Sequence, residues 1–446
     1  MREAYDSPTI ISHLPGLANK FGRSHNHNFM PEIDGVNVKA LMAEYGSPLF
    51  IFSERTLRRT IREARRAFEV RYPKVRFAWS YKTNYLDAIC RIFHDEGSWA
   101  EVVSEYEYEM ARRLNIPGEH IIFNGPYKSR EALRKAISEG ATIHLDSHDE
   151  MYVCEQVAEE LGRVVEVGMR LNMDTGTYPA WSRFGFNLDN GEAWGALQRI
   201  KMGGKLKVKG IHSHLGTFIL DPTVYRRAVE KLADFAKKAA ELDFEVEYID
   251  VGGGFASKNT LHEQYAPGDE ANPTFDDYAE MVTSALLDAN FPGDNPPTLV
   301  LETGRALVDE CGFLATSCVA NKRLPSGLKT TVVDAGVNVM FTSFWYKHKV
   351  TPVDDYRGTL EETVLYGPLC MNIDVLRPSV LLPPLSPGDA VVIHPVGAYN
   401  VTQWMQFIRM RPAIVLIGED GKVCKVRDAE TIDAVKSHEH MPEWLA

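Results

Sequence analysis

Four groups of residues that could take part in chemistry each stand at the end of a short apolar run. The groups are Lys82 after residues 75–80, His212 and His214 in 208–216, Gly252, Gly253 and Gly254 in 246–254, and Glu302, Gly304 and Arg305 in 298–304. Each group by itself has an ordinary structural explanation, such as a surface lysine, a core histidine, a tight turn or an ion pair. Found together at equivalent ends of different strands, they indicate a single site.

These residue types suit the chemistry of pyridoxal 5'-phosphate (PLP). The amine of Lys82 can form a Schiff base with an aldehyde, and the carboxylate of Glu302 can keep a pyridine nitrogen protonated. The imidazole of His214 can stack on a ring. Backbone N–H groups of Gly252–Gly254 and the guanidinium of Arg305 can bind a phosphate. The glycine run does not have the GxGxxG spacing of a dinucleotide site.

Eight apolar runs alternate with segments of helical periodicity, such as residues 225–242. The runs are residues 75–80, 99–104, 120–125, 141–147, 164–172, 208–216, 246–254 and 298–304. Alternating units of this kind predict a parallel sheet, and eight of them predict an α/β fold with a (β/α)8 barrel. Its active site would lie at the C-terminal strand ends. An open doubly wound sheet is the alternative.

After residue 307 the alternation of strand and helix patterns gives way to β-rich segments. Residues 328–337, 388–397 and 411–428 are β-rich, and EDGK at 419–422 indicates a hairpin turn. The N-terminal segment 31–53 could join them. We therefore predict a barrel domain at residues 49–307, and a β-rich domain formed by residues 1–48 and 308–446.

Composition excludes several classes of protein. The 446 residues carry a net charge of −12, which argues against a general nucleic-acid or acidic membrane surface. The sequence has no apolar run long enough for a membrane span and no leader-like N-terminus. The six cysteines show no CxxC spacing, which favours reduced thiols and a cytoplasmic location. HNHNF (25–29) and HEHMPEW (438–444) lack a spaced fourth ligand, so we expect no metal.

The sequence resembles the barrel-type PLP-dependent decarboxylases, the family of diaminopimelate decarboxylase and eukaryotic ornithine decarboxylase. The resemblance extends from about residue 45 to residue 410. It rests on YKTN (81–84), HSHLGT (212–217), VGGGF (251–255), ETGR (302–305), GPLC (367–370) and GAY (397–399). The family usually has EPGR at 302–305. Thr303 replaces the proline, while Glu302, Gly304 and Arg305 are kept.

The resemblance implies roles that residue patterns do not give. Lys82 corresponds to the lysine that carries PLP. Thr217 and Tyr399 correspond to residues near the phosphate. Cys370 corresponds to a cysteine that reaches the partner's active site in a head-to-tail homodimer and protonates the substrate carbon. The expected partners are therefore an amino-acid substrate and a second copy of the chain, with shared active sites.

The family's substrate contacts are altered. Met371 follows the GPLC cysteine where diaminopimelate decarboxylases usually carry glutamate, although Asp374 matches a family aspartate. Thr342 stands where those enzymes supply an arginine, and Tyr346 is kept. Because losing a charged partner costs about 2–5 kcal/mol of binding, diaminopimelate is expected to be a poor substrate. A non-standard or conjugated diamino acid is expected instead, by family analogy in siderophore or other secondary metabolism.

Three other functions are alternatives to a decarboxylase of a non-standard or conjugated diamino acid. A true diaminopimelate decarboxylase that makes L-lysine would need unusual distal contacts. A barrel racemase would place arginine near the pyridine nitrogen, and Glu302 argues against it. A non-catalytic binding protein of the family would have no reason to keep both Lys82 and Cys370.

Overall fold

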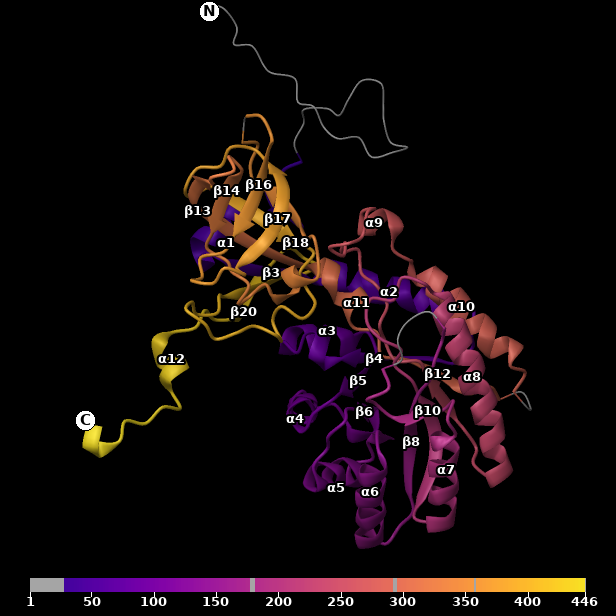
Figure 1. The fold of residues 1–446 in the computed structure, drawn as a ribbon. Helices are drawn as coiled ribbons and strands as arrows, with labels where there is room; N and C mark the ends of the chain where they lie inside the picture. Colours follow the sequence, from indigo (N-terminus) through magenta and orange to yellow (C-terminus); the bar gives the residue numbers. More distant parts are fainter. Residues whose placement is uncertain (1–27, 177–180, 292–294, 357, 446) are drawn as a thin grey trace, which may run out of the picture. The chain divides into compact units, whose positions relative to one another are not determined.

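The computed structural model describes residues 28–176, 181–291, 295–356 and 358–445. The chain forms two compact units (Figure 1). One consists of Glu54–Cys311 together with the short segment Gly397–Thr402, and the other contains the remaining described residues.

The first unit is a barrel of eight parallel strands. The strands are β4 (Val75–Ser80), β5 (Trp99–Val102), β6 (Ile121–Phe123), β7 (Thr142–Leu145), β8 (Val165–Asn172), β10 (Leu206–His212), β11 (Tyr248–Asp250) and β12 (Thr298–Leu301). Neighbouring strands pair in the order β10-β11-β12-β4-β5-β6-β7-β8, and β8 pairs back with β10. This last pairing closes the sheet, so the predicted (β/α)8 barrel is confirmed and the open sheet is excluded. A short strand, β9 (Phe186–Asn187), also pairs with β8.

Helices cover the outside of the barrel strands (Figure 1). They are α2 (Glu54–Glu69), α3 (Asp87–Asp95), α4 (Glu105–Arg113), α5 (Arg130–Ser138), α6 (His148–Leu161), α7 (Glu192–Gly203), α8 (Thr223–Ala239) and α10 (Phe275–Asp288). Ser104, Ser129 and Ser147 begin three consecutive helices by accepting a hydrogen bond from a backbone N–H of the first turn. These caps end the loops after β5, β6 and β7, and so fix where the strand-end residues lie.

The barrel interior changes character along its axis. Ala78, Ile122 and Val300 form a buried apolar cluster, against which Trp99 and Tyr248 pack. Nearer the C-terminal strand ends, buried polar side chains replace apolar ones. They include Glu101, Asn124, His144, Arg170, His212, Asp250 and Glu302. Buried polar groups need partners, so this end of the barrel is where a functional site is built.

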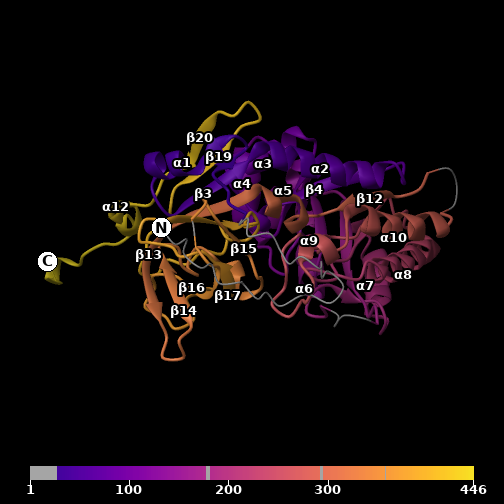
Figure 2. The ribbon, with the colours of Figure 1, turned by 90° about the horizontal axis from the view of Figure 1, so that it is seen from above.

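The second unit is β-rich. Its main sheet has the order β17 (Val375–Leu382), β16 (Glu361–Tyr366), β14 (Lys329–Val333), β13 (Gly312–Arg323), β3 (Leu49–Ser53), β19 (Ile414–Ile417) and β20 (Val423–Arg427). β15 (Lys349–Pro352) pairs with β18 (Ala390–His394), which pairs with β13. β14, β16 and β17 lie side by side in Figure 2. The turn predicted at EDGK joins β19 to β20.

The N-terminal segment joins this β-rich sheet. It contains β1 (Glu32–Ile33), β2 (Val36–Asn37), α1 (Val38–Tyr45) and β3. β3 pairs antiparallel with β13 and parallel with β19, and Leu49 and Ile51 belong to the apolar core of this unit. The sequence boundary at residue 49 had placed this strand with the barrel. The difference arises because a short apolar strand does not reveal its pairing partner.

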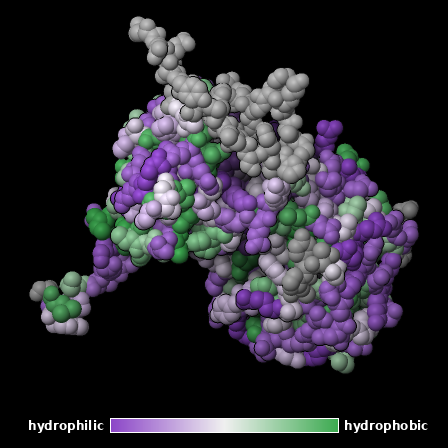
Figure 3. Space-filling view, turned by 45° about the horizontal axis from the view of Figure 1, so that its top comes forward, coloured by the Kyte–Doolittle hydropathy of each residue, from purple (hydrophilic) through white to green (hydrophobic). Residues whose placement is uncertain are grey.

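The face of the molecule in Figure 3 is mostly hydrophilic, with apolar residues scattered over it. None of the helices in the described ranges combines the length and the apolarity that crossing a bilayer requires. All six cysteines are described and free, and four of them are buried.

Candidate active site

Lys82 lies just beyond β4, in the helical turn Tyr81–Thr83. Its Nζ donates a hydrogen bond to Glu101 Oε2 at 2.6 Å, and Ser80 Oγ donates to the same oxygen at 2.6 Å. Burial acts to lower the pKa of Lys82, but the charges of Glu101 and Glu302 outweigh it and raise the pKa above its ordinary value. Without a covalent partner, Lys82 is therefore an ammonium group at neutral pH.

Glu302 follows β12 and is buried at the centre of the site. Its Oε1 accepts a hydrogen bond from Asn124 Nδ2 at 2.6 Å, and its Oε2 lies 3.3 Å from His212 Nε2. Burial acts to raise the pKa of Glu302, but the positive charge of Lys82 and the Asn124 hydrogen bond hold it below its ordinary value. Glu302 is thus a buried carboxylate that keeps its negative charge.

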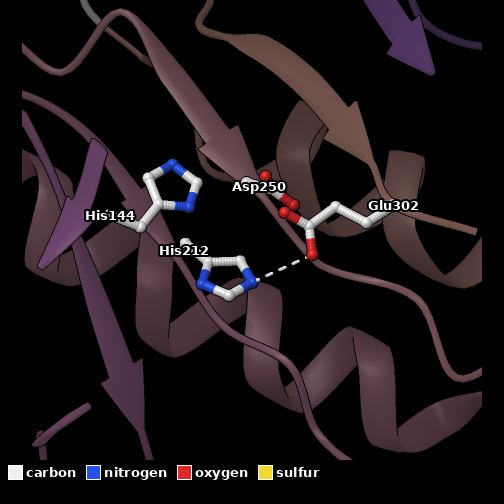
Figure 4. Close-up of side chains that lie close together, drawn as sticks. All are labelled: His144, His212, Asp250 and Glu302. Atoms are coloured by element: carbon white, nitrogen blue, oxygen red, sulfur yellow. Dashed lines mark ion pairs between the residues drawn. The ribbon is translucent and has the colours of Figure 1, made fainter. Parts of the chain in front are cut away.

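Asp250 faces Glu302 from the end of β11. In Figure 4 the two carboxyl groups point toward each other, with His212 and His144 beside them. Burial, followed by the charge of Glu302, raises the pKa of Asp250 well above its ordinary value. Two buried carboxyl groups this close cannot both be ionised. Asp250 therefore carries the proton and Glu302 the charge.

The three glycines after β11 form a cradle with no room for side chains. Gly252 and Gly254 have φ of +65° and +96°, which favours glycine. A Cβ at Gly252 would lie 2.6 Å from His214 Nδ1, and one at Gly253 would lie 2.6 Å from the backbone oxygen of Glu302. Only a backbone without side chains lets these loops lie so close to one another.

His214 is a neutral imidazole at this cradle. Its Nδ1 accepts a hydrogen bond from Gly253 N at 3.0 Å. Burial, followed by the charge of Lys82, lowers the pKa of His214 to about 3. A neutral ring held in this way can pack flat against another ring without adding charge to it.

The predicted phosphate-binding side chains also come together. Arg305 Nη2 donates to Thr217 Oγ1 at 3.3 Å, and its guanidinium lies over the Tyr399 ring at 4.5 Å. Tyr399 reaches the barrel because its backbone N–H donates to Thr83 O at 2.8 Å. Gly304 lies against Thr83, where a Cβ would overlap the threonine hydroxyl.

The arrangement fits PLP. It brings together a lysine amine, a buried charged carboxylate, a neutral imidazole and a glycine cradle with an arginine beside it. These are the groups that PLP needs for its aldehyde, its pyridine nitrogen, its ring face and its phosphate. The barrel part of the sequence-predicted site therefore lies in one place.

The interior residues that the sequence reasoning missed include Glu101, Asn124, His144 and Asp250. Glu101 and Asn124 are hydrogen-bonded to predicted site residues, and His144 and Asp250 lie in one cluster with Glu302. The sequence did contain a sign of them. Each is a polar residue within a mostly apolar strand (WAEVV, IIFNG, TIHL and YIDV). In a buried strand such a residue needs a partner.

The predicted substrate-side residues belong to the β-rich unit. Cys370 is exposed and Met371 is partly exposed. Asp374 is buried, and its carboxylate accepts hydrogen bonds from Val337 N at 2.8 Å and Leu369 N at 2.7 Å. Asp374 thus holds the loop that carries Cys370, while a contact to substrate remains a prediction.

Thr342 and Tyr346 are both buried in the same unit. The Thr342 hydroxyl is hydrogen-bonded to His348 Nε2 at 2.8 Å. The place where the family resemblance expects an arginine is thus filled by a compact polar pair. Of the two histidine-rich stretches, His25 and His27 lie outside the described residues, whereas His438 and His440 lie within them.

Comparison with known proteins adds independent findings. The family model described as "Pyridoxal-dependent decarboxylase, pyridoxal binding domain" matches residues 57–309. The chain is 28% identical over 414 residues to diaminopimelate decarboxylase of Aquifex aeolicus, covering 90% of this chain and 94% of that one. It is 29% identical over 427 residues to the enzyme of the same name from Archaeoglobus fulgidus, covering 93% and 97%.

Solved structures are similar over the whole fold. The crystal structure of diaminopimelate decarboxylase from Methanocaldococcus jannaschii has a TM-score of 0.85 at 28% identity, and the similarity covers 93% of this chain and 97% of that one. A lysine/ornithine decarboxylase from Vibrio vulnificus has a TM-score of 0.71 at 21% identity, covering 86% and 98%. This second similarity concerns the fold alone.

Proposed function

Since this chain belongs to the family of pyridoxal-dependent decarboxylases, we propose how its own residues carry out the reaction and which substrates it takes. The chain is a PLP-dependent amino-acid decarboxylase, with the family's pyridoxal-binding domain at residues 57–309. One observation supports these residue assignments. Lys82, Glu302, His214 and the glycine cradle Gly252–Gly254 lie together at the C-terminal ends of the barrel strands.

Lys82 binds the cofactor aldehyde through Nζ, and Glu302 holds a proton on the pyridine nitrogen. His214 packs against the ring. Bound PLP supplies an electron sink for the negative charge left at the substrate Cα when CO2 leaves. The negative charge of Glu302 serves this chemistry, because a protonated ring withdraws electrons more strongly. Asp250, being protonated, adds no second negative charge beside Glu302.

The phosphate is held by Gly252–Gly254 together with Thr217, Arg305 and Tyr399. Arg305 supplies the formal positive charge, and Thr217 supplies a hydroxyl 3.3 Å from it. Gly304 allows Arg305 to start a short helix, α11 (Arg305–Val308), close against Thr83. Charge-assisted hydrogen bonds of this kind are about twice as strong as neutral ones. They would anchor the cofactor through its phosphate.

Lys82 must lose a proton before its amine can react. The Glu101 carboxylate 2.6 Å away and the charge of Glu302 keep it protonated until then. We assign the protonation of the substrate Cα to Cys370, acting in the active site of a second copy of the chain. Its exposed position in the β-rich unit is compatible with that role. This proposal makes the enzyme a homodimer whose β-rich domains complete each other's sites.

For the substrate, we propose an amino acid that lacks the distal charged groups of diaminopimelate. Met371 offers a thioether where an ammonium group would need a carboxylate. Thr342, bound to His348, offers a neutral hydroxyl where a carboxylate would need a cation. A diamino acid whose distal amine is conjugated, or a non-standard one without a distal charge, meets both conditions. Diaminopimelate itself is the second candidate, because relatives carrying that name match more than 90% of the chain at 28–29% identity.

A substrate panel tests these candidates. The PLP-loaded enzyme is incubated with meso-diaminopimelate, lysine, ornithine, arginine and citryl-conjugated diamino acids, and mass spectrometry detects products lighter by one CO2. Turnover of a conjugated diamino acid with diaminopimelate inert supports the proposal, whereas turnover of free lysine, ornithine or arginine, which keep a distal cation, contradicts the argument from Met371. Rapid turnover of diaminopimelate contradicts it and assigns the second candidate. The Lys82→Ala variant is the control for decarboxylation that does not depend on the site.

A further inference from the structure

Three hydrogen-bonded side chains lead to Glu302 through the interior of the barrel. Tyr248 OH lies 3.0 Å from His144 Nε2, and His144 Nδ1 lies 2.7 Å from Asn124 Oδ1. Asn124 Nδ2 lies 2.6 Å from Glu302 Oε1. We call Tyr248, His144 and Asn124 the interior file. It links strands β11, β7 and β6 to the carboxylate after β12.

The chemistry of the partners fixes the direction of every hydrogen bond. An ionised carboxylate can only accept, so the Asn124 amide nitrogen donates to Glu302 and also to Glu101, 3.0 Å away. The amide oxygen must then accept from His144 Nδ1. Burial, followed by the neighbouring His212, lowers the pKa of His144 well below its ordinary value. The ring is therefore neutral, and its Nε2 accepts from the Tyr248 hydroxyl.

All three donors of the interior file thus point the same way, toward Glu302. Donors aligned in a chain polarise one another and strengthen the final hydrogen bond. The other groups close to Glu302 are consistent with this arrangement. Asp250 is protonated, and the ring of His212 stacks on His144 with centroids 4.7 Å apart. Lys82 and Arg170 supply positive charge to the cluster.

Two glycines make room for the interior file. A Cβ at Gly168 would overlap both the His144 ring and the Tyr248 hydroxyl, and a Cβ at Gly210 would overlap the Tyr248 ring. Gly168 lies in β8 and Gly210 in β10, which pair with each other. Neither has the positive φ that would require glycine for conformational reasons. Glycine weakens a strand, so what these two positions provide is space for the file.

Tyr248 is the outer end of the file. It begins β11 and lines a cavity of about 380 Å³ at the N-terminal strand ends, along with Arg76, Val165 and Lys209. The proposed PLP site is at the opposite, C-terminal ends. Hydrogen bonds through His144 and Asn124 connect Tyr248 to Glu302.

We propose that Tyr248, His144 and Asn124 are positioning residues, which orient the Glu302 carboxylate toward the pyridine nitrogen and stabilise its negative charge. The inference rests on the proposed role of Glu302. Without the interior file, Glu302 would be a stronger base and would take the proton from the ring. Each member of the file acts through its neighbour, and none needs to touch cofactor or substrate.

The test uses PLP with an isotopically labelled pyridine nitrogen, bound to the full-length enzyme and observed by NMR. In Tyr248→Phe the ring stays and only the hydroxyl is lost. The nitrogen shift should move toward that of an unprotonated ring. The dissociation constant of PLP should rise by no more than about fivefold, because the full energy of one buried hydrogen bond is the upper limit of an effect passed on through Glu302. Tyr72→Phe is the matched control, since Tyr72 is buried with its hydroxyl donating to Pro297 O.

A second pair of variants distinguishes the hydrogen bond from packing. His144→Leu removes the donor to Asn124 and should shift the nitrogen signal further than Tyr248→Phe. His144→Asn places an amide nitrogen near the position of Nδ1 and should restore most of the parent signal. Equal effects of leucine and asparagine would overturn the inference, because they would show that only packing matters.

The role of Glu302 is tested separately with Glu302→Gln. If this variant shifts the nitrogen signal while Tyr248→Phe and His144→Leu do not, the interior file has no positioning role. If Glu302→Gln itself leaves the signal unchanged, the proposed partner of the pyridine nitrogen is wrong. Should His144→Leu fail to fold, Tyr248→Phe decides the question, since it deletes a single oxygen atom.

Discussion

Lys82 Nζ lies 2.6 Å from Glu101 Oε2, and Glu101 is completely buried on the neighbouring strand β5. In the proposed role of Lys82, the pair thus joins an amine that must react as a neutral group to a carboxylate that keeps it charged. Cofactor capture is therefore expected to depend on pH through this contact.

Glu101→Gln should speed the capture of PLP by the unloaded protein near pH 7. Removing the Glu101 charge lowers the pKa of Lys82, so a larger fraction of the amine is neutral at a given pH. The rate at which visible absorbance appears after adding PLP measures this. The rate–pH profile should move to lower pH, and an unchanged profile would contradict the role given to Glu101.

Lys82→Ala should abolish the visible absorbance of the PLP-loaded protein and lower the decarboxylation rate by at least about a hundredfold, as expected on losing a covalent catalytic group. Absorption spectra and CO2 release measure the two effects. Lys74→Ala, at a partly exposed lysine just before β4, is the control and should behave like the parent. Persistence of the absorbance in Lys82→Ala would mean that another lysine binds the cofactor.

Met371→Glu should increase kcat/KM for diaminopimelate by at least about tenfold, because a carboxylate at this position can pair with the distal ammonium group. Met371→Gln has nearly the same size without the charge and should produce a much smaller gain. Steady-state kinetics on both variants separate charge from shape. If the parent enzyme already turns over diaminopimelate rapidly, the substrate proposal fails.

Glu107→Gln should stabilise the protein increasingly as pH rises. Burial raises the pKa of Glu107 to about 7, and the charge of Glu101 adds to this. The folded state therefore binds this proton more tightly than the unfolded state, so the group's contribution to the unfolding free energy falls as pH rises from about 4.5 to 7.

Glutamine remains neutral and can still accept the hydrogen bond from Val103 N. The stability difference between variant and parent should therefore be small at pH 5 and approach about 3 kcal/mol at pH 8. Denaturant unfolding at the two pH values measures it. Glu105→Gln, at an exposed position on the same helix, should show no such trend, and a pH-independent difference in Glu107→Gln would refute the shifted pKa.

Lys128→Met should destabilise the fold by about 3–5 kcal/mol, the cost of leaving one member of a buried ion pair alone. The Lys128 side chain is fully buried, and its Nζ donates to Glu150 Oε1 at 2.8 Å, Gly125 O at 2.9 Å and His144 O at 3.0 Å. Adding Glu150→Gln should recover part of the loss. Denaturant unfolding of both proteins tests this, and a double variant no more stable than the single one would show that the pair is not coupled.

Much of the fold followed from local patterns in the sequence. Each of the eight apolar runs overlaps a barrel strand, since a buried parallel strand needs little more than a short apolar stretch between helices. Lys82, Glu302 and the glycine run were found because chemically capable residues at C-terminal strand ends must face one another once the barrel closes. The family was identified from the same residues, and the family model confirms it.

Other features depend on contacts that no local pattern contains. Asn124 and Glu302 are 178 residues apart, and only the closed barrel places the amide 2.6 Å from the carboxylate. The charges and hydrogen-bond donors around Asp250 and Glu302 determine which of the two carboxyl groups is protonated. The partners of β3 were likewise set by tertiary pairing.

The sequence by itself thus determined which residues could do chemistry and on which strands they stand. The tertiary structure decided their charge states and the interior file behind Glu302, because hydrogen bonding and burial act between residues that the chain brings together only when it folds.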